Sequence, residues 1–189
     1  MSMNEEALFP RFLRLRIVEA LSDSPVVLIH GPRQCGKTTL ARLVGDDAGF
    51  ACLSFDDDVQ LAAAKADPIG YIADLPERVV LDEVQRVPEI FTSLKAAVDA
   101  RRAPGRFILT GSANVLLVPK LADSLAGRME ILRLHPLSQA ELNGRPSGFL
   151  SRLFDSGFKV GVSARRQGRA LAERVACGGF PAALARATH

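Results

Sequence analysis

Short apolar runs alternate along the chain with longer segments in which apolar residues recur at helical spacing. Five of these runs have the length of strands and end in polar or turn residues, which is typical of strands buried in a sheet. They lie at residues 26–29, 50–55, 78–81, 106–112 and 129–134. This alternation predicts an α/β fold in which a mainly parallel sheet carries helices on both faces.

The segments between the strand-like runs predict the helices that cover the sheet. Residues 11–21 have an apolar stripe opposite several arginines, as expected for a helix packed on a sheet. Two short helices are predicted at residues 62–66 and 69–73, separated by a proline. A further helix is predicted to open at Pro88, and residues 113–126 are helical by composition.

The pattern divides the chain at about residue 137. We expect an α/β core over residues 1–137. The remaining residues carry only short helical patterns, at 138–142, 147–155 and 163–176, and a sharp turn at 178–181. Residues 138–189 are therefore predicted to form a helical segment, which is either an incomplete lid or the start of a further domain.

A glycine-flanked loop follows the first predicted strand and precedes a helix predicted to begin near Lys37. Its sequence fits the Walker A pattern G-x-x-x-x-G-K-[ST], which requires this strand–loop–helix context. The glycines let successive backbone N–H groups turn toward phosphate oxygens, and the helix N-terminus adds partial positive charge. The predicted nucleotide-binding residues are Gly31, Pro32, Arg33, Gln34, Cys35, Gly36, Lys37, Thr38 and Thr39.

We predict specific roles for three side chains of this loop. Lys37 is expected to reach the β- and γ-phosphates, and the Thr38 hydroxyl to bind Mg²⁺. Cys35 lies where N–H dipoles and Lys37 converge, an environment that can activate a thiol. The alternative for Cys35 is a buried, inert thiol.

A second motif ends the third predicted strand, where Asp82 and Glu83 follow the apolar run. In the Walker B pattern the aspartate binds Mg²⁺, and the glutamate orients and deprotonates the attacking water. Two acids also end many ordinary strands, but their position downstream of the phosphate loop supports the functional interpretation. A glutamate at this place favours water as the phosphoryl acceptor, and therefore hydrolysis.

Polar residues also follow the second predicted strand and end the fourth. Thr110 and Ser112 are candidates for holding the attacking water, although Ser112 could equally cap the next helix. Asp56, Asp57 and Asp58 allow a metal site, but a solvated strand end with a helix cap is the favoured interpretation. Nucleotide is expected at the carboxyl ends of the strands.

Composition and charge narrow the possible binding partners and cellular location of the protein. A net charge of +3 permits a DNA partner but does not argue for one. Three scattered cysteines without a C-x-x-C pair predict neither a disulfide framework nor a zinc site, which favours a reducing cytosol. The acidic N-terminus lacks a signal core, and no apolar run is long enough to cross a bilayer. We therefore expect a cytoplasmic protein without a membrane partner.

Taken together, these motifs resemble a bacterial and archaeal family of AAA-type ATPases that carry a C-terminal domain of poorly known function. The resemblance rests on the GPRQ-x-GKT, DE-x-Q and L-T-G-S elements, in that order, with residues 124–128 and 178–181, and covers residues 11–185. It implies a P-loop NTPase three-layer sandwich with strand order 5-1-4-3-2, ATP as ligand and Mg²⁺ as cofactor. Family members are longer, which implies that this chain is the ATPase part of such an architecture.

The resemblance also implies roles for two residues outside the two Walker motifs. Ser112, after the fourth strand, is implied to sense the γ-phosphate. Arg128, just before the fifth strand, is implied as an arginine finger that acts on a neighbouring subunit. The alternative for Arg128 is a salt bridge within its own chain.

Three classes of function are compatible with these observations. The leading hypothesis is a Mg²⁺-dependent ATPase whose turnover drives a conformational change in a partner or C-terminal domain, within a homo-oligomer or a complex with a partner protein. The second is a nucleotide-dependent binding switch, DNA-associated in one version, with weak or no hydrolysis. The third is a P-loop kinase. Phosphate release without an added acceptor separates the first class from the others.

Overall fold

The computed structural model describes residues 9–112, 125–145, 148, 153–155 and 168–187. Contacts divide the chain into two units, which are described separately. One unit is Leu13–His135, and the other combines the chain up to Phe12 with the chain from Pro136 onward. Residues 113–124 of the helix predicted at 113–126, and most of the helix predicted at 147–155, lie outside the described residues, and residues 125–126 form a turn.

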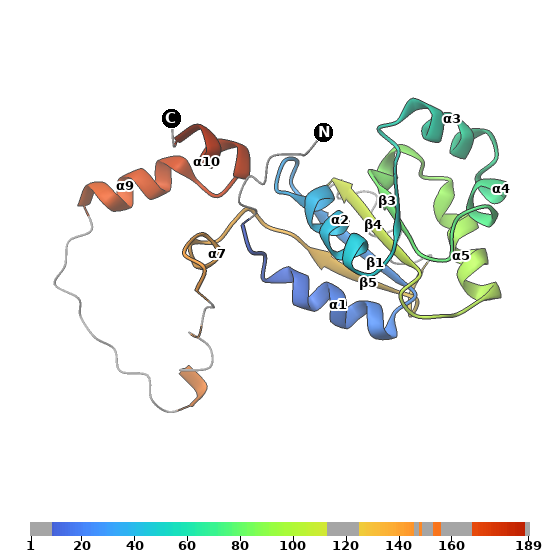
Figure 1. Ribbon diagram of the computed structural model, residues 1–189, viewed down its shortest axis with the longest axis horizontal. Helices are drawn as coiled ribbons and strands as arrows, with labels where there is room; N and C mark the ends of the chain where they lie inside the picture. Colours follow the sequence, from blue (N-terminus) through green and yellow to red (C-terminus); the bar gives the residue numbers. More distant parts are fainter. Residues whose placement is uncertain (1–8, 113–124, 146–147, 149–152, 156–167, 188–189) are drawn as a thin grey trace. The chain divides into compact units, whose positions relative to one another are not determined.

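The unit Leu13–His135 is built on a five-stranded sheet (Figure 1). The strands are β1 (Val26–Gly31), β2 (Ala51–Ser54), β3 (Val79–Asp82), β4 (Phe107–Ser112) and β5 (Met129–Arg133). Their order is β2-β3-β4-β1-β5, and every neighbouring pair is parallel. This is the predicted order 5-1-4-3-2 read from the other edge, so the predicted fold class is confirmed.

Helices cover both faces of the sheet and make three layers (Figure 1). One face carries α1 (Leu13–Asp23) and α2 (Lys37–Asp47), and the other carries α3 (Asp58–Ala66), α4 (Pro68–Ala73) and α5 (Ile90–Ala100). Successive strand residues point to opposite faces. In β1, Val27 and Ile29 therefore pack with α1 and α2, while Val26 and Leu28 pack on the other side. Burial on both faces explains why the strands are continuous apolar runs in the sequence.

Two glycines allow backbone segments to approach closely around the first strand and its helix. A Cβ at Gly31 would lie 2.1 Å from the carbonyl oxygen of Leu134, so this position excludes any side chain. A Cβ at Gly45 would lie 2.8 Å from Cγ2 of Val80, so this glycine lets α2 pack directly against β3. The start of the phosphate loop is therefore held against the chain that leaves β5.

Two elements differ from the sequence prediction. The helix predicted from Pro88 begins at Ile90, and a 3-10 turn, Val84–Arg86, occupies the preceding space. The chain also forms α10 (Pro181–Ala187), a helix that the sequence analysis did not predict. Its signal was available, because proline is favoured in the first turn of a helix and the alanines that follow favour helix.

The second unit contains α7 (Gln139–Leu142), α9 (Gly168–Cys177) and α10. A capping box begins α7, as Oγ of Ser138 accepts from the N–H of Glu141 at 3.2 Å and the Glu141 carboxylate accepts from the N–H of Ser138 at 2.8 Å. This helix was predicted at residues 138–142. None of the helices in the described part of the chain has the length and apolar character needed to cross a membrane.

The carboxylate of Glu141 also binds the N-terminal part of this unit. It is only 7% exposed, and it accepts from the N–H of Phe12 at 3.0 Å and from Nε of Arg11 at 3.2 Å. Burial by itself raises the pKa of Glu141, but the N–H groups of Ser138 and Phe12 and the Arg11 guanidinium outweigh it, so the pKa is lowered. Glu141 therefore links segments that are distant in the sequence.

The lowered pKa predicts a pH-dependent contribution of Glu141 to stability. This contribution is present above the ordinary glutamate value of about 4.3 and is lost as the pH falls through the lower folded-state pKa. We expect the unfolding free energy to fall more steeply for the wild-type chain than for Glu141→Gln between about pH 5 and pH 3. Urea denaturation at several pH values measures both curves.

A matched control for this substitution lies on α9. Glu173 pairs with Arg169 on the exposed surface of that helix, so Glu173→Gln should keep the wild-type pH dependence. Parallel curves for the wild-type chain and Glu141→Gln would contradict the role assigned to Glu141.

Candidate nucleotide-binding site

The residues of both sequence motifs meet at the carboxyl edge of the sheet. The register of β1 and β4 pairs Gly31 with Ser112. The neighbouring strand β3 runs parallel to β4 and ends at Asp82. Ligands of open parallel α/β sheets bind outside this edge. The structure thus brings the phosphate loop, the acidic motif and the end of β4 to one place, as the sequence analysis expected.

The loop between β1 and α2 has the backbone shape of an anion-binding turn. Gln34 and Gly36 adopt left-handed conformations, with φ of 61° and 95°, and Gly36 is the N-cap of α2. Such residues within a turn direct successive N–H groups into one concavity, and the N-terminus of α2 adds its own N–H groups. The N–H of Leu40 bonds to the carbonyl oxygen of Gly36 at 3.0 Å, so regular helix begins there.

Lys37 is buried although it carries a charge, with 5% of its surface exposed. Its Nζ donates to the carbonyl oxygen of Pro32 at 2.9 Å, which keeps the ammonium group against the loop. Burial, followed by the positive charge of Arg133, lowers the pKa of the neighbouring His30. The imidazole of His30 is therefore neutral at pH 7, next to a loop whose lysine is charged.

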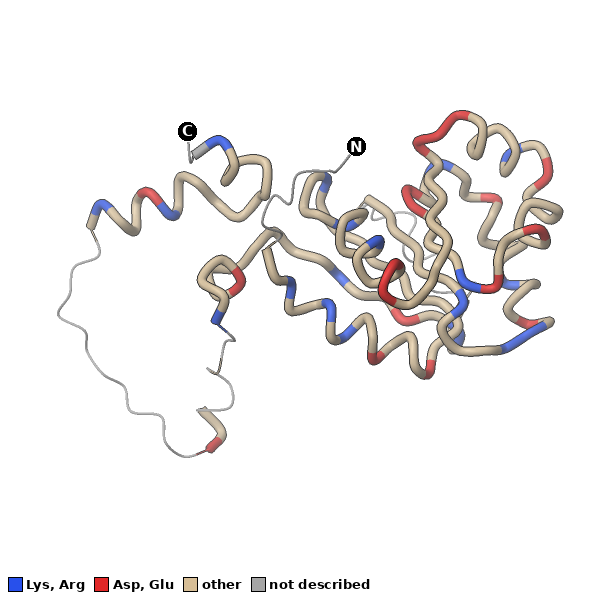
Figure 2. The backbone as a smooth tube through the Cα atoms, viewed as in Figure 1, with Lys and Arg blue, Asp and Glu red and all other residues tan. Residues whose placement is uncertain are grey.

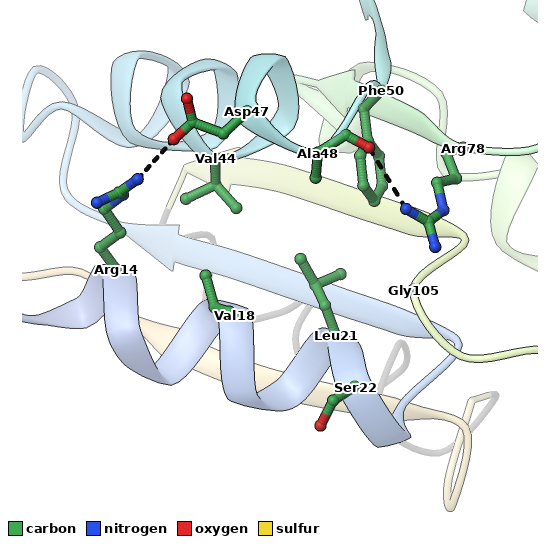
Figure 3. Close-up of a pocket in the computed structure, with 10 residues that line it drawn as sticks. All are labelled: Arg14, Val18, Leu21, Ser22, Val44, Asp47, Ala48, Phe50, Arg78 and Gly105. Carbon is green, nitrogen blue, oxygen red and sulfur yellow. Dashed lines mark hydrogen bonds and ion pairs between the residues drawn. The ribbon is translucent and has the colours of Figure 1, made fainter.

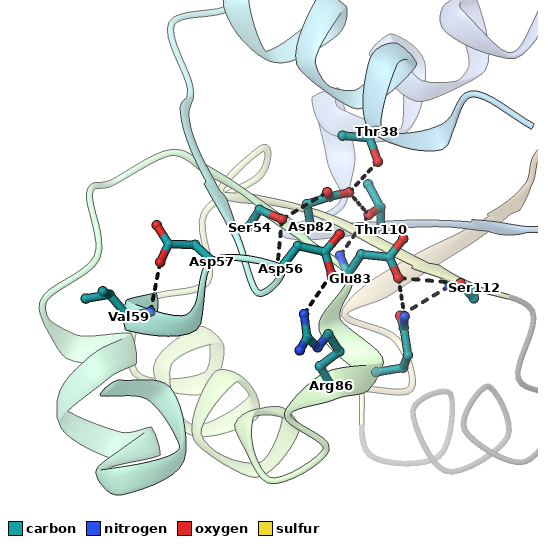
Figure 4. A network of polar contacts seen from close by, with 11 residues as sticks. Thr38, Ser54, Asp56, Asp57, Val59, Asp82, Glu83, Arg86, Thr110 and Ser112 are labelled. Carbon is teal, nitrogen blue, oxygen red and sulfur yellow. Dashed lines mark hydrogen bonds and ion pairs between the residues drawn. The ribbon is translucent and has the colours of Figure 1, made fainter. Parts of the chain in front are cut away.

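The carboxylate of Asp82 collects hydroxyl groups from three other elements (Figure 4). Oγ1 of Thr38, in the first turn of α2, donates to it at 2.8 Å. Oγ of Ser54, the last residue of β2, donates at 3.2 Å, and the Thr110 hydroxyl of β4 donates as well. Asp82 is 5% exposed, so these hydrogen bonds compensate a buried charge.

This cluster offers the oxygen ligands that Mg²⁺ prefers. Magnesium is usually held by one or two carboxylates together with substrate phosphates, rather than by a cage of protein ligands. In the part of the chain that the structure describes, no three His, Cys, Asp or Glu side chains group into such a cage. Thr38 and Asp82, the predicted metal ligands, supply a hydroxyl and a carboxylate to this cluster.

Ser54 was not among the predicted site residues. It ends β2, whose register pairs it with Asp82 on β3. A polar residue at the carboxyl end of a strand was the available signal. The resemblance implied that β2 and β3 are neighbours, but the register that places Ser54 opposite Asp82 arises only in the folded sheet.

Glu83 leaves β3 in a left-handed conformation, with a φ of 58°. Its N–H donates to the hydroxyl of Thr110 at 3.1 Å. Its carboxylate accepts from the side-chain amide of Gln85. It also accepts, at 3.4 Å, from the hydroxyl of Ser112 (Figure 4). Gln85 is a second residue that the sequence analysis did not assign to the site. The predicted catalytic residues Glu83 and Ser112 are therefore in contact.

Two of the three aspartates after β2 form a helix cap and an ion pair, and the third, Asp58, begins α3. Asp57 is the N-cap of α3, and its carboxylate accepts from the N–H of Val59 at 2.8 Å. Asp56 pairs with Arg86 at 2.8 Å (Figure 4). The favoured interpretation of this segment as a strand end with a cap is confirmed.

The remaining loop residues contribute mainly backbone to the turn. The side chain of Cys35 is buried, and its thiol lies 3.7 Å from the carbonyl oxygen of Leu134, to which it donates. This burial matches the inert alternative considered for the thiol. The side chains of Arg33, Gln34 and Thr39 are exposed, whereas those of Pro32 and Thr38 are half-buried.

Arg128 lies at the amino ends of the strands, whereas the phosphate loop lies at their carboxyl ends. Its carbonyl oxygen accepts from the N–H of Val26, the first residue of β1, at 3.2 Å. An extended strand of this length spans roughly 17 Å, which separates Arg128 from the phosphate loop of its own chain. Its side chain, 28% exposed, forms an ion pair with Asp99 and donates to the carbonyl oxygen of Ala126 at 3.2 Å. The salt bridge considered as an alternative is therefore present.

A separate hollow of about 330 Å³ lies between α1 and α2 (Figure 3). Its apolar lining is Val18, Leu21, Val44, Ala48 and Phe50. Phe50 and Gly105, which also lines it, precede β2 and β4, so the hollow is near the amino ends of the strands. It is distinct from the site at the carboxyl edge.

Comparison with known families agrees with this geometry. Residues 23–143 match the family described as AAA domain, whose members are AAA-type P-loop ATPases. The chain belongs to this family. The matched region runs from the end of α1 through α7 and includes every residue of the site described above.

Two curated relatives are each 42% identical to this AAA domain over 123 residues, or 65% of the chain. They are the uncharacterized proteins Mb2031c of Mycobacterium bovis and Rv2008c of Mycobacterium tuberculosis. The aligned region covers 28% of the length of each relative, so each is much longer than the region it shares with this chain.

Solved structures share the fold at lower identity. The Walker-type ATPase PABY2304 of Pyrococcus abyssi is 18% identical, with a TM-score of 0.57, over 93% of this chain and 65% of that one. A DNA replication initiation factor is 17% identical, with a TM-score of 0.51, over 83% of this chain and 55% of that one. At these identities the likeness establishes the fold alone.

The position of Lys37 predicts the effect of removing its charge. Lys37→Ala should weaken ATP binding by about 3 kcal/mol, or roughly a hundredfold in Kd, because it removes a charge-assisted contact to phosphate. Titration calorimetry measures the affinity, and circular dichroism checks that the fold is kept. The exposed Lys65 of α3 supplies the control, since Lys65→Ala should bind ATP as the wild-type chain does. Equal affinity in all three proteins would overturn the phosphate-loop assignment.

Proposed function

We propose that this AAA domain binds ATP with Mg²⁺ and hydrolyses it to ADP and phosphate. The observation that carries the proposal is the cluster around Asp82, where hydroxyls from α2, β2 and β4 converge beside the phosphate loop. Glu83 follows directly and contacts Ser112 at the end of β4. A phosphate-binding turn, an oxygen-ligand cluster and a carboxylate thus adjoin one another, which are the parts that phosphoryl transfer to water requires.

In the proposed mechanism the loop holds the triphosphate. Its N–H groups and the ammonium group of Lys37 bind the β- and γ-phosphate oxygens, and Lys37 exchanges its contact with Pro32 for these oxygens. Thr38 and Asp82 would hold Mg²⁺. When bound, Mg²⁺ supplies positive charge that neutralises charge on the β- and γ-phosphate oxygens.

Glu83 acts as the general base on the attacking water. The water oxygen forms a bond to the γ-phosphorus, while the bond between that phosphorus and the β–γ bridging oxygen breaks and ADP leaves with the electron pair. Glu83 takes the proton of the water. Ser112 is placed in this scheme as the residue that contacts the γ-phosphate or the water, and its hydroxyl already lies 3.4 Å from the Glu83 carboxylate.

We further propose that turnover drives a conformational change in a partner or in a further part of a longer protein. The much greater length of the mycobacterial relatives supports this, because the AAA domain is one portion of each. A homo-oligomer is the arrangement in which Arg128 could serve a second site. Its position at the amino edge of the sheet places it away from its own loop.

The DNA-associated switch receives less support from the charges. In α1, Arg14 forms an ion pair with Asp47. Arg16 forms ion pairs with Glu19 and Glu130. Figure 2 shows basic residues in the first part of α1 and acidic residues toward its end. Phosphate contacts require lysines and arginines whose charge is not already neutralised, so this helix does not offer a basic surface for nucleic acid.

Substitution of Glu83 separates binding from chemistry. Glu83→Gln should retain ATP and Mg²⁺ binding while hydrolysis falls by about 10²–10⁴-fold, because the amide keeps the shape of the side chain but cannot accept the proton. Phosphate release without an added acceptor gives the rate, and calorimetry gives the affinity. Glu89, exposed just before α5, provides the control Glu89→Gln, which should hydrolyse ATP normally. Wild-type turnover by Glu83→Gln would mean that another group deprotonates the water.

Mixing experiments test whether Arg128 acts on a neighbouring subunit. Arg128→Ala retains Glu83, and Glu83→Gln retains Arg128, so a mixed assembly would rebuild some complete sites. We expect each variant alone to be slow and the mixture to recover activity, since an arginine finger contributes roughly 10³–10⁵ in rate. Activity of the wild-type chain should also rise with protein concentration.

Two controls make the mixing result decisive. Arg101, exposed and paired with Glu77 near the end of α5, supplies Arg101→Ala, which should not slow hydrolysis. Native mass spectrometry establishes that the two variants assemble together. Mixtures that co-assemble without recovering activity would show that Arg128 serves only its ion pair with Asp99.

A further inference from the structure

The side-chain amide of Gln85 bridges two parts of the candidate site. Gln85 is half-buried in the 3-10 turn Val84–Arg86. Its Nε2 donates to the carboxylate of Glu83, and its Oε1 accepts from the N–H of Ser112 at 3.2 Å. One side chain therefore connects the acidic turn after β3 with the last residue of β4.

The chemistry of the two partners explains why this bridge uses glutamine. A backbone N–H can only donate, and an ionised carboxylate can only accept. A side chain between Ser112 and Glu83 must therefore present one acceptor and one donor, and a carboxamide has both at a fixed spacing. A glutamate in the place of Gln85 would set two carboxylates against each other, and a lysine would have no acceptor.

The surroundings leave room for this amide and restrict its movement. A Cβ at Gly111 would lie 3.1 Å from Oε1 of Gln85, so the glycine before Ser112 provides the space that the amide occupies. Glu83 has a left-handed backbone, a conformation that is strained in a residue other than glycine. The bond from its N–H to Thr110 and the bonds to its carboxylate from Gln85 and Ser112 hold it there.

We propose that Gln85 is a positioning residue that fixes the carboxylate of Glu83 against the end of β4. The proposal rests on the ATPase function proposed above. Ser112 contacts both Gln85 and Glu83, so a γ-phosphate that displaces Ser112 also changes how Glu83 is held. Gln85 thereby couples the occupation of the phosphate site to the orientation of the general base.

The kinetic test compares two substitutions of different chemistry. Gln85→Met keeps a similar length and removes both polar atoms, whereas Gln85→Glu keeps the acceptor for Ser112 and loses the donor for Glu83. For both variants we expect kcat to fall roughly 10- to 100-fold, the cost of misplacing a reacting group, with the Kd for ATP unchanged. If Gln85→Met does not fold, Gln85→Glu still provides the comparison.

A matched control is Gln60 of α3, whose amide oxygen accepts from the hydroxyl of Tyr71 at 2.7 Å. Gln60→Glu makes the same change of amide to acid outside the site and should keep the wild-type kcat. A wild-type kcat in both Gln85 variants would overturn the proposal. An equal loss of ATP affinity and kcat would also overturn it, because that pattern indicates a structural role.

A spectroscopic test does not depend on hydrolysis. The side-chain NH₂ signal of Gln85 in ¹⁵N spectra of the nucleotide-free chain is assigned by its loss in Gln85→Met. In Glu83→Gln the charged acceptor becomes a neutral one, which makes a weaker hydrogen bond. We therefore expect the Gln85 signal to move upfield in Glu83→Gln and to stay in place in Glu89→Gln.

The two tests distinguish failure of this inference from failure of the proposed function. An unmoved Gln85 signal in Glu83→Gln overturns the bridge, whatever the rate of hydrolysis. A wild-type chain that releases no phosphate overturns the ATPase proposal, and with it the catalytic role of Gln85. A moved signal together with a selective loss of kcat supports both.

Discussion

The site depends on the hydrogen bonds that compensate the buried carboxylate of Asp82. An ionised carboxylate away from water is costly unless hydrogen bonds compensate it. Here the compensation comes from Thr38, Ser54 and Thr110, which belong to α2, β2 and β4. These hydroxyls reach Asp82 only because β2, β3 and β4 are parallel neighbours that end at one edge. The same arrangement of strands therefore stabilises the charge of Asp82 and assembles the site.

One hydroxyl joins the two halves of the site. Thr110 donates to Asp82, a proposed magnesium ligand, and accepts from the N–H of Glu83, the proposed general base. Polar networks in a low-dielectric interior are stabilised when every member is paired and are costly when one member is lost. The left-handed backbone of Glu83 is maintained by this network, so the direction of its carboxylate depends on contacts with β4.

The sheet also separates two positively charged residues, Lys37 and Arg128. The phosphate loop with Lys37 follows the carboxyl end of β1, and Arg128 is bonded to the amino end of the same strand. A rigid strand between them prevents Arg128 from reaching the loop of its own chain. Within the chain, Asp99 balances the charge of Arg128. This placement is the reason for proposing that Arg128 acts on another subunit.

The sequence by itself determined the fold class and the loop. Strands buried on both faces appear as continuous apolar runs, and the glycines at 31 and 36 with Lys37 between a strand and a helix specify a phosphate-binding turn. Local patterns of this kind depend on neighbouring residues, which a sequence displays directly. The same holds for Asp57, whose role as a helix cap is a local one.

Only the tertiary structure decided which distant residues meet. Ser54 joins Asp82 because β2 lies next to β3, and Gln85 reaches Ser112 because a 3-10 turn returns the chain toward β4. The implied strand order already put β2 beside β3, and Gln85 already belonged to the DE-x-Q element. The side-chain contacts themselves were not predicted, because they depend on the register and the turn direction of the folded sheet. The burial of Cys35 beneath Leu134 and the pairing of Arg128 with Asp99 arose in the same way, from the approach of segments far apart in the chain.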